Sequence, residues 1–286
     1  MREGRPSTTA AFVSFFRGAA STPGAPFSGM RDDRARDLVP AWLRAILVGL
    51  EAAPWLLPLA RISSFGLLDH VSLRTAAIDD ELRTGLGRGA TQLVILGAGL
   101  DARAYRLADI GDVAVFEVDF PATQAEKRAR LDPTSATARS VTFVGVDFER
   151  DSLDERLASA GHDPEVPTAW IWEGVTPSLD AAAFDATLEV VARRSARAST
   201  LLVTYVTPDL LRFDLAPRWL VRAGFVALGE PLKATFDPAE LRARLEAHGL
   251  AVSSDTGSPD WAPRFLSGRA APVVICERLA AAVRRG

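Results

Sequence analysis

Acidic residues follow several short apolar runs of this sequence, at the points where each run gives way to polar residues. Asp119 closes "VFEVD", Asp147 follows "VGV", and Glu173 follows "WIW". A carboxylate at the end of a buried run can accept hydrogen bonds from hydroxyl or amino groups of a ligand and can balance a cationic centre. The pattern therefore predicts an acidic rim around one binding site.

The stretch "LVILGAGLDARAYR" at 93–106 is the second chemical signal. Gly97 and Gly99 follow an apolar run and precede a predicted helix that begins near Asp101. Without side chains, these glycines allow a sharp turn and a close approach of a ligand to the backbone amides. Glycines after a strand can also make a simple turn. Their position, after the first of several alternating runs, favours the binding role.

"GAGLDA" also matches the dinucleotide fingerprint, with Asp119 lying 20 residues beyond Gly99. This motif alone predicts an NAD(P)-dependent oxidoreductase. Against it, Asp101 lies where the helix N-terminus would receive a pyrophosphate, although Arg103 could offset the repulsion. Several acids around one rim suit S-adenosylmethionine, which has hydroxyls, an amino group and a cationic centre. A third alternative is a cofactor-binding protein that has lost its chemistry.

Short apolar runs alternate with amphipathic segments over the second part of the chain. We expect strands at 93–96, 113–118, 141–146, 169–172, 200–206 and 272–276. Segments such as "PATQAEKRARL", "SLDERLASA" and "DAAAFDATLEVVARR" between them have helical spacing. Alternating strands and helices predict an α/β fold with a mainly parallel sheet and helices on both faces. Ligands of such sheets bind beyond the carboxyl ends of the strands, where the glycine turn lies.

Helical spacing dominates the start of the chain, so we expect an N-terminal helical cap over residues 1–88 and a cofactor-binding core over 89–286. The most apolar part is "AWLRAILVGLEAAPWLLPLA" at 41–60. Charged residues interrupt it, and Pro54 and Pro58 break any helix there, which argues against a membrane span. A buried helix pair is one interpretation; the other is that residues 1–70 form helices over the carboxyl end of the sheet and close an apolar acceptor pocket. The residues expected to form this lid are Trp42, Trp55, Leu56, Leu57 and Phe65.

Composition limits the classes of partner. The 286 residues include 33 Lys and Arg against 36 Asp and Glu, a net charge of −3, which offers no basic face for nucleic acid or an anionic membrane. Cys276 is the one cysteine, so neither an intrachain disulfide nor a cysteine zinc site is expected. The N-terminus lacks the apolar core of a signal peptide. We therefore expect a cytoplasmic protein, without a metal, that acts on a small molecule; the oligomeric state stays open.

Four motifs, "QLVILGAGLDARAYRL", "VFEVDFP", "GVDF" and "WEGVTPSL", together resemble the leucine carboxyl methyltransferase family. The similarity includes "RPSTTAAFVSFFRGAAS" and "SLRTAAIDDEL", and so covers residues 5–206. The resemblance implies a class I, Rossmann-like methyltransferase with S-adenosylmethionine as cofactor. The family includes carboxyl methyltransferases that act on polyketides, which implies O-methylation in secondary metabolite biosynthesis.

The resemblance assigns roles in cofactor binding. Gly97 and Gly99 would lie against the methionine portion, and Asp119 would accept hydrogen bonds from the ribose hydroxyls. The alternative for Asp119 is a helix N-cap, since a proline follows at a helix start. Asp147 and Phe148 would bind the adenine, through the carboxylate and the backbone amide. Their alternative is an ordinary strand end followed by a loop.

Further positions follow from the same resemblance. Arg74 would clamp the cofactor carboxylate, with an exposed helix arginine as the alternative. Glu173 would face both the cofactor and the acceptor. Arg17 matches an arginine of the bacterial N-terminal segment and could replace the N-terminal lysine of eukaryotic members. Ser178 stands where many bacterial relatives have tyrosine, which reshapes the acceptor side.

The chemistry of the acceptor decides whether a base is needed. A carboxylate arrives ionised, whereas a hydroxyl or phenol must lose a proton. His70 would share one helical face with Arg74, four residues later, or else be a capping or exposed residue. His162 is expected in a surface loop and His248 at a helix C-terminus. Tyr205 is expected to line the pocket. We therefore expect a small apolar acid as acceptor, with a hydroxyl or phenol as the alternative.

Overall fold

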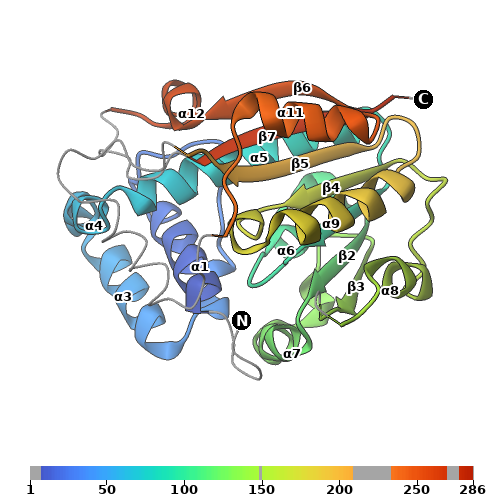
Figure 1. Cartoon of the computed structure of the whole chain (residues 1–286). Coiled ribbons are helices and arrows are strands. Elements are labelled where there is room, and N and C mark those ends of the chain that lie inside the picture. Colours follow the sequence, from blue (N-terminus) through green and yellow to red (C-terminus); the bar gives the residue numbers. More distant parts are fainter. Residues whose placement is uncertain (1–7, 148–149, 209–232, 269–276, 286) are drawn as a thin grey trace.

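A seven-stranded sheet forms the centre of the molecule (Figure 1). The structure is a computed structural model, and it describes residues 8–147, 150–208, 233–268 and 277–285. The sheet has the order β3-β2-β1-β4-β5-β7-β6, in which β7 runs antiparallel to both neighbours and the other pairs are parallel. The strands are β1 (Gln92–Leu96), β2 (Ala114–Asp119), β3 (Ser140–Gly145), β4 (Thr168–Trp172), β5 (Thr200–Val206), β6 (Leu250–Gly257) and β7 (Glu277–Arg284).

The predicted α/β fold with a mainly parallel sheet is confirmed. The first five predicted strands match β1 to β5, with bounds that differ by at most one residue. The predicted strand at 272–276 lies outside the described residues. The sequence analysis did not predict β6 and β7, which add the antiparallel edge. Both contain a smaller share of large apolar residues than β1 ("QLVIL") and β4 ("TAWIW"), as the sequences "LAVSSDTG" and "ERLAAAVR" show.

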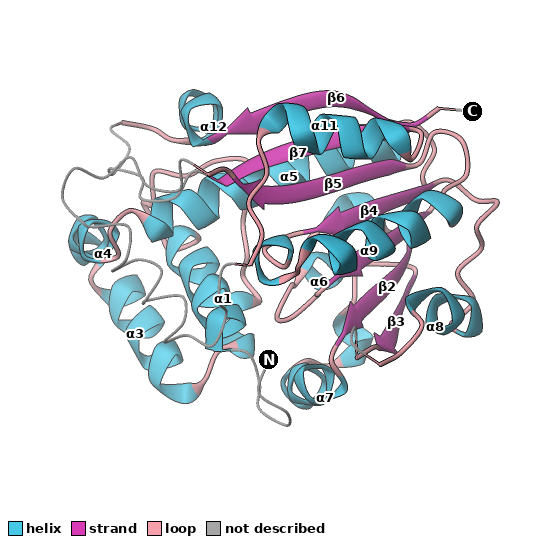
Figure 2. Ribbon diagram, viewed as in Figure 1, coloured by secondary structure: helices cyan, strands magenta, loops and turns pink. Residues whose placement is uncertain are grey.

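Helices cover both faces of the sheet (Figure 2). Alternate residues of a strand point to opposite faces. In β1, Leu93 and Ile95 pack into a core with α1 (Thr8–Ala20), α5 (Leu67–Gly87) and α12 (Ser258–Phe265). Val94 and Leu96 pack on the other side with α8 (Leu153–Ser159), α9 (Ala181–Arg193) and α11 (Pro238–Ala247). Burial on both faces explains why β1 is apolar at nearly every position.

Local signals fix where the covering helices begin. The Ser152 side chain accepts the backbone N–H of Glu155 at the start of α8, and Asp180 accepts that of Ala183 at the start of α9. Proline begins α7 (Pro121–Arg130), where its fixed φ suits the first helical turn. The shorter helical segments are α2 (Ala35–Leu38), α6 (Arg103–Arg106), η2 (Ala108–Ile110), η3 (Pro133–Ser135) and η4 (Thr176–Ser178).

Several of the helices before β1 lie beside the carboxyl end of the sheet. Figure 1 shows α1, α3 (Ala41–Ala52) and α4 (Leu57–Ser63) gathered beside the ends of β4 and β5. The Arg17 side chain of α1 donates a hydrogen bond of 2.9 Å to the Leu100 carbonyl, just after the glycine turn. Helix α5 instead runs along the sheet and contacts β4, β5 and β7. The division of the chain at residue 88 stays a prediction.

The exposure of the predicted lid residues contradicts the prediction that they close a pocket. Leu57 is buried, but Trp42, Trp55, Leu56 and Phe65 are 56%, 75%, 42% and 69% exposed. Helix α3 buries a single stripe on its inner side, and the rest of its surface faces outward although much of it is apolar. The expectation that these four side chains close a pocket is therefore wrong.

The bend between α3 and the next helix agrees with the prediction from Pro54 and Pro58. A short 3-10 helix, η1 (Pro54–Leu56), leads from α3 into α4. In the described part of the chain, no one helix combines the length and the apolar composition that crossing a membrane requires. When α3 and the segment 54–63 are counted as one span, they meet both criteria, but the chain bends by 108° between them.

Candidate active site

The glycine turn leaves β1 between two neighbouring strands that end in acidic residues. Leu96 pairs with Val118 of β2 on one side and with Trp172 of β4 on the other. The residues that follow these three, Gly97, Asp119 and Glu173, therefore leave the sheet side by side. Parallel register thus brings together three positions that the sequence analysis assigned to one site.

The two glycines have backbone conformations that other residues rarely adopt. Gly97 has φ of +67° and Gly99 has φ of +48°. A Cβ added at Gly99 would lie 3.2 Å from the Ala10 Cβ and 4.0 Å from Asp119 Oδ2. A Cβ added at Gly97 would lie 2.2 Å from Val175 Cγ2, in the loop after β4. At Gly97 the turn has no room for a larger residue unless Val175 moves, whereas at Gly99 the left-handed backbone conformation favours glycine more than the tight contact with Ala10 does.

Asp119 lies directly against this turn. The Gly99 N–H donates to Asp119 Oδ2, and the Phe120 N–H donates to Oδ1 at 2.6 Å. Burial raises the pKa of Asp119, and these two amide hydrogen bonds oppose the shift. The N-cap of α7 is Phe120, not Asp119, and no side chain caps that helix. The N-cap alternative for Asp119 is therefore wrong, and its carboxylate remains part of the glycine turn.

Glu173 is held between two arginines. Arg74 Nε donates to Oε1 at 2.9 Å, and Arg103 Nη1 donates to Oε2 at 2.8 Å. Burial alone would raise the pKa of Glu173, but Arg103 and then Arg74 outweigh it and lower the pKa to about 2. Glu173 is consequently an anion at neutral pH and does not serve as a proton donor there. The alternative of an exposed helix arginine at position 74 is wrong, since Arg74 is buried.

A second carboxylate holds Arg74 from the opposite side. Arg74 Nη1 donates to Glu277 Oε2 at 2.6 Å, and His70 Nε2 lies 2.7 Å from the same oxygen. The other ring nitrogen of His70 lies 2.9 Å from Ser258 Oγ. Helix α5 thus presents His70 and Arg74 on one face, as their spacing predicted, but His70 is buried and neither exposed nor a cap.

Glu277 is the functional candidate that the sequence analysis missed. Burial would raise its pKa, but Arg74 and the hydrogen bond from His70 lower it to about 2. A signal for it existed, because Glu277 directly follows the apolar run at 272–276. This is the same pattern that singled out Asp119, Asp147 and Glu173.

Asp101 lies just before the short helix α6, which begins at Arg103. Its Oδ1 accepts the Arg103 N–H at 2.7 Å, and its Oδ2 accepts from Arg103 Nη1. Burial would raise the pKa of Asp101, but Arg103 and then Arg17 lower it. The ionised carboxylate of Asp101 therefore accepts the hydrogen bond of the Arg103 amide, to which a pyrophosphate would otherwise bind. This geometry counts against the dinucleotide interpretation.

Buried ion pairs continue outward from Arg103. Arg103 Nε donates to Asp79 Oδ1 at 2.7 Å, and Arg106 Nη1 lies 2.7 Å from Asp79 Oδ2. Arg17 Nε lies 3.4 Å from Asp32 Oδ2, and Arg17 Nη1 lies 3.8 Å from Asp101 Oδ2. The buried arginine at position 17 thus connects the cap helix α1 with the glycine turn.

Three further candidates lie on β5, after β3 and in the loop after β4. The Tyr205 hydroxyl donates to Asp255 Oδ2 of β6 at 2.8 Å, and burial followed by this hydrogen bond raises the pKa of Tyr205. Asp147 follows β3, where its backbone N–H donates to Asp151 Oδ2 at 2.9 Å. Phe148 lies outside the described residues. Ser178 Oγ donates to the Val175 carbonyl at 2.7 Å, in the loop after β4.

The other two histidines lie away from the glycine turn. His162 is buried, not in an exposed loop, and its Nε2 lies 3.2 Å from Thr168 Oγ1 at the first residue of β4. Burial and then Arg194 lower the pKa of His162 to about 4. His248 follows α11 as predicted, and Gly249 after it has φ of +74°. Neither histidine is placed as a base for this site.

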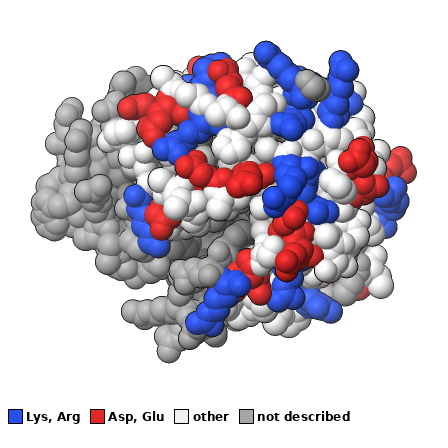
Figure 3. Space-filling model, turned by 45° about the vertical axis from the view of Figure 1, so that its right-hand side comes forward, with Lys and Arg blue, Asp and Glu red and all other residues white. Residues whose placement is uncertain are grey.

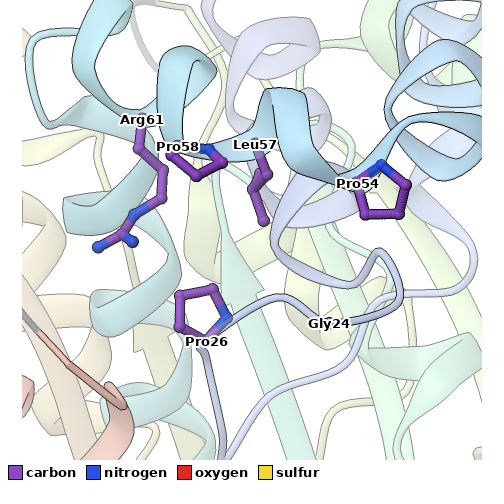
Figure 4. Close-up of a pocket in the computed structure, with 6 residues that line it drawn as sticks. All are labelled: Gly24, Pro26, Pro54, Leu57, Pro58 and Arg61. Atoms are coloured by element: carbon purple, nitrogen blue, oxygen red, sulfur yellow. The ribbon is translucent and has the colours of Figure 1, made fainter.

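Two surface cavities lie on the N-terminal helices and near α6. One, of about 240 Å³, lies between the loop at Gly24 and Pro26 and the start of α4, with Arg61 at its edge (Figure 4). The other, of about 310 Å³, is lined by Arg31, Asp33, Arg34, Tyr105 and Arg106. On the face that Figure 3 shows, basic and acidic side chains are interspersed.

Comparison with known proteins agrees with the geometry. The family model for leucine carboxyl methyltransferase matches residues 17–192. A Rhodococcus jostii protein is 38% identical over 209 residues, 72% of this chain and 68% of its own length. A Streptomyces coelicolor protein is 42% identical over 53% of this chain and 50% of its own length. Both names assign these relatives to the S-adenosyl-L-methionine-dependent methyltransferases. Against several of these relatives, the chain spans only about half of their length.

Solved structures show the same fold at low identity. A Thermobifida fusca protein whose title calls it a methyltransferase has a TM-score of 0.60 at 16% identity and covers 100% of this chain and 97% of its own. A DUF574 family protein from Streptomyces avermitilis has a TM-score of 0.61 at 14% identity and covers 99% of each chain. With the matched family model covering residues 17–192, the chain belongs to the leucine carboxyl methyltransferase family.

Proposed function

We propose that this protein is an S-adenosylmethionine-dependent O-methyltransferase that converts the carboxylate of a small apolar acceptor into a methyl ester. The observation that carries the proposal is the convergence of Gly97, Asp119 and Glu173 at the ends of three adjacent parallel strands. Family membership and the names of the relatives support the same reaction class. The acceptor, of the kind found in secondary metabolism, is inferred from the chemistry of the site.

The residues present fit this cofactor. The glycine turn has the positive φ angles that a sharp turn after a strand requires, and the side chains of Val175 and Ala10 lie against it. Asp119 would accept hydrogen bonds from the ribose hydroxyls in exchange for its present amide donors. Arg74 would hold the carboxylate of the methionine portion in exchange for part of its present contacts with Glu173 and Glu277, and Glu173 would attract the ammonium group. Asp147 would contact the adenine at the end of β3.

Bound S-adenosylmethionine supplies an electrophilic methyl group on a sulfonium centre. The chain's own residues must then bind and orient the reactants and exclude water. Glu173 is suited to this as a permanent anion, because two arginines keep it ionised. It moves no proton, and a cationic ligand beside it would share its negative charge with Arg74 and Arg103.

An already ionised acceptor is favoured because neither the three histidines nor Tyr205, all within the described residues, is placed to act as a base. His70 has both ring nitrogens in hydrogen bonds to Ser258 and Glu277, and the other two histidines lie at other parts of the fold. The raised pKa of Tyr205 makes its phenolate harder to form, which speaks against a role as a base. A carboxylate needs no deprotonation near neutral pH, since its pKa is about 4–5.

Binding and turnover test the proposal separately. We expect S-adenosylhomocysteine to stabilise the protein against heat, by about 2.7 kcal/mol at a hundredfold excess over its dissociation constant. NAD and NADP should give no such shift. Stabilisation by NAD or NADP alone would contradict the methyltransferase assignment.

The acceptor class requires a chemical assay. The purified protein should transfer labelled methyl groups to small apolar carboxylic acids, and mild alkali should release the label as methanol. A product that resists alkali would be an ether, which would contradict the carboxyl assignment and leave the methyltransferase assignment intact. A rate that is flat with pH above the ionisation of the acid is the second expected result.

A further inference from the structure

Two buried side chains behind Arg74 take no part in the proposed contacts with the cofactor. Glu277 is the first residue of β7, and His70 lies about one helical turn before Arg74 on α5. The side chains of His70, Glu277 and Arg74 are 2%, 5% and 8% exposed. Burial of such polar groups is unfavourable unless they have partners. Both are linked to Arg74, Glu277 directly and His70 through Glu277.

We propose that Glu277, held by His70, is the positioning residue for Arg74, so that one edge of the guanidinium faces the cofactor carboxylate before the cofactor binds. Because this role concerns the methionine portion of S-adenosylmethionine, it rests on the proposed function. On binding, Arg74 would exchange its contact with Glu173 and keep its contact with Glu277.

The two acids hold different edges of the Arg74 guanidinium. Nε and Nη2 both lie 2.9 Å from Glu173 Oε1, whereas Nη1 donates to Glu277 Oε2 at 2.6 Å. The edge formed by Nε and Nη2 has the fork geometry that binds both oxygens of a carboxylate. A ligand carboxylate at this edge would leave the contact between Nη1 and Glu277 undisturbed.

Glu173 can release Arg74 more easily than Glu277 can, because Glu173 has a second cation. Arg103 Nη1 donates to Glu173 Oε2 at 2.8 Å, and the ammonium group of the cofactor would replace the cation that is lost. Among the described residues, Arg74 is the one arginine that pairs with Glu277. The release of Arg74 would leave the buried charge of Glu277 with His70 alone, which is costly.

His70 fixes the orientation of the Glu277 carboxylate. Its Nε2 lies 2.7 Å from Glu277 Oε2, the oxygen that also accepts from Arg74. Glu277 is ionised at neutral pH, since its pKa is about 2, and an ionised carboxylate can only accept, so His70 Nε2 carries the hydrogen of this bond. His70 Nδ1 lies 2.9 Å from Ser258 Oγ at the start of α12, which holds the ring from its other side. Ser258, His70 and Glu277 thus form a chain that ends at Arg74.

The test compares two ligands that differ in the part that Arg74 would hold. S-adenosylhomocysteine has the carboxylate, whereas 5′-methylthioadenosine has the same adenosine and sulfur without the amino-acid portion. Glu277→Gln should weaken S-adenosylhomocysteine about 3- to 10-fold, because Arg74 must then be ordered on binding instead of beforehand. The affinity for 5′-methylthioadenosine should change by less than about twofold. Calorimetry on the full chain measures both dissociation constants.

Two variants of His70 test the chain behind Glu277 with a smaller loss of charge. His70→Leu removes the donor to Glu277 and should weaken S-adenosylhomocysteine about threefold or more. His70→Gln can still donate to Glu277 and should bind S-adenosylhomocysteine within about twofold of wild type. If Glu277→Gln is too unstable to purify, these two variants decide the question, and equal affinities of both for S-adenosylhomocysteine would overturn the proposal.

Asp154→Asn is the matched control, because it changes a similar group of acid, arginine and histidine on the opposite face of the sheet. Asp154 Oδ1 accepts from Arg194 Nη1 at 3.0 Å. Arg194 Nε in turn donates to His162 Nδ1 at 3.2 Å. Asp154→Asn should leave the affinities for both ligands unchanged.

Three results contradict the role of Glu277 in different ways. An equal loss of affinity for both ligands in Glu277→Gln would mean a structural role, which overturns the proposal. An unchanged or tighter affinity for S-adenosylhomocysteine would also overturn it, because Glu277 would then not position Arg74. A wild-type protein that binds neither ligand would overturn the proposed function, and this role with it.

Discussion

Arg74, in the helix before the first strand, donates a hydrogen bond of 2.6 Å to Glu277, the first residue of the last strand. Arg74 also holds Glu173 at the end of β4 at 2.9 Å. One buried cation therefore joins three parts of the chain that are far apart in sequence. The breaking of such a pair leaves an uncompensated buried charge, which costs far more than the loss of an exposed ion pair.

The first prediction concerns acid. The folded protein holds the pKa of both Glu173 and Glu277 at about 2, below the ordinary value of 4.5. The unfolded chain therefore takes up these protons first as the pH falls, so the stabilisation is complete above about 4.5 and is lost toward 2. We expect the free energy of unfolding to fall by on the order of 2–3 kcal/mol per carboxylate over this window. Urea titrations at a series of pH values measure it.

Glu277→Gln separates this effect from general acid denaturation. The variant should be less stable than wild type at pH 7 and should lose less stability between pH 4.5 and 2. Glu246→Gln, at an exposed glutamate of α11, is the control and should follow the wild-type curve. Equal pH slopes for wild type and Glu277→Gln would contradict the coupling of Glu277 to Arg74.

The second prediction concerns cofactor affinity. Asp119→Ala should weaken S-adenosylhomocysteine about 10- to 100-fold, since a hydrogen bond to a charged group contributes about 1.5–3 kcal/mol. Asp109→Ala is the matched control, because Asp109 is exposed and pairs with Arg83 on the surface. Calorimetry on both folded variants gives the dissociation constants. An unchanged affinity in Asp119→Ala would exclude the ribose role.

Sequence patterns predicted those parts of the structure that depend on local composition. Apolar runs gave β1 to β5, and parallel register then brought Gly97, Asp119 and Glu173 together without further information. Position after an apolar run was enough to identify these residues, because the ends of parallel strands meet at one edge of a sheet.

Long-range partners were not predictable in the same way. Glu277 reaches Arg74 only because β7 enters the sheet antiparallel, next to β5, and its sequence "ERLAAAVR" has little strand character. The outward orientation of Trp42 and Trp55 was missed for a related reason. Apolar composition predicted burial, but which side of α3 faces the core depends on tertiary packing.

The third prediction concerns the buried pair of Lys127 and Glu117. Lys127 Nζ lies 2.5 Å from Glu117 Oε2, and burial raises the pKa of Glu117 in spite of Lys127. Lys127→Met should cost about 3–5 kcal/mol of unfolding free energy, because it leaves a buried carboxylate without its cation. The double variant Lys127→Met/Glu117→Gln should recover much of this loss. Chemical denaturation of the wild type, Lys127→Met and the double variant measures the three free energies of unfolding. A double variant no more stable than Lys127→Met would contradict the pairing.

The last prediction separates backbone strain from crowding at the glycine turn. Gly97→Ala introduces a Cβ at φ of +67° and places it 2.2 Å from Val175 Cγ2. Gly89 has φ of +98° with nothing within 4 Å of an added Cβ, so Gly89→Ala reports the backbone cost alone, about 1–2 kcal/mol. Gly97→Ala should cost about 1–3 kcal/mol more than this control, because overpacking adds to the strain.

Val175→Ala removes the atom that clashes, so the double variant Gly97→Ala/Val175→Ala should be more stable than the sum of the two single effects on the free energy of unfolding predicts. Strict additivity in urea denaturation would mean that the loop after β4 does not lie against the turn, and the closeness of Glu173 to Gly97 would then be in doubt as well.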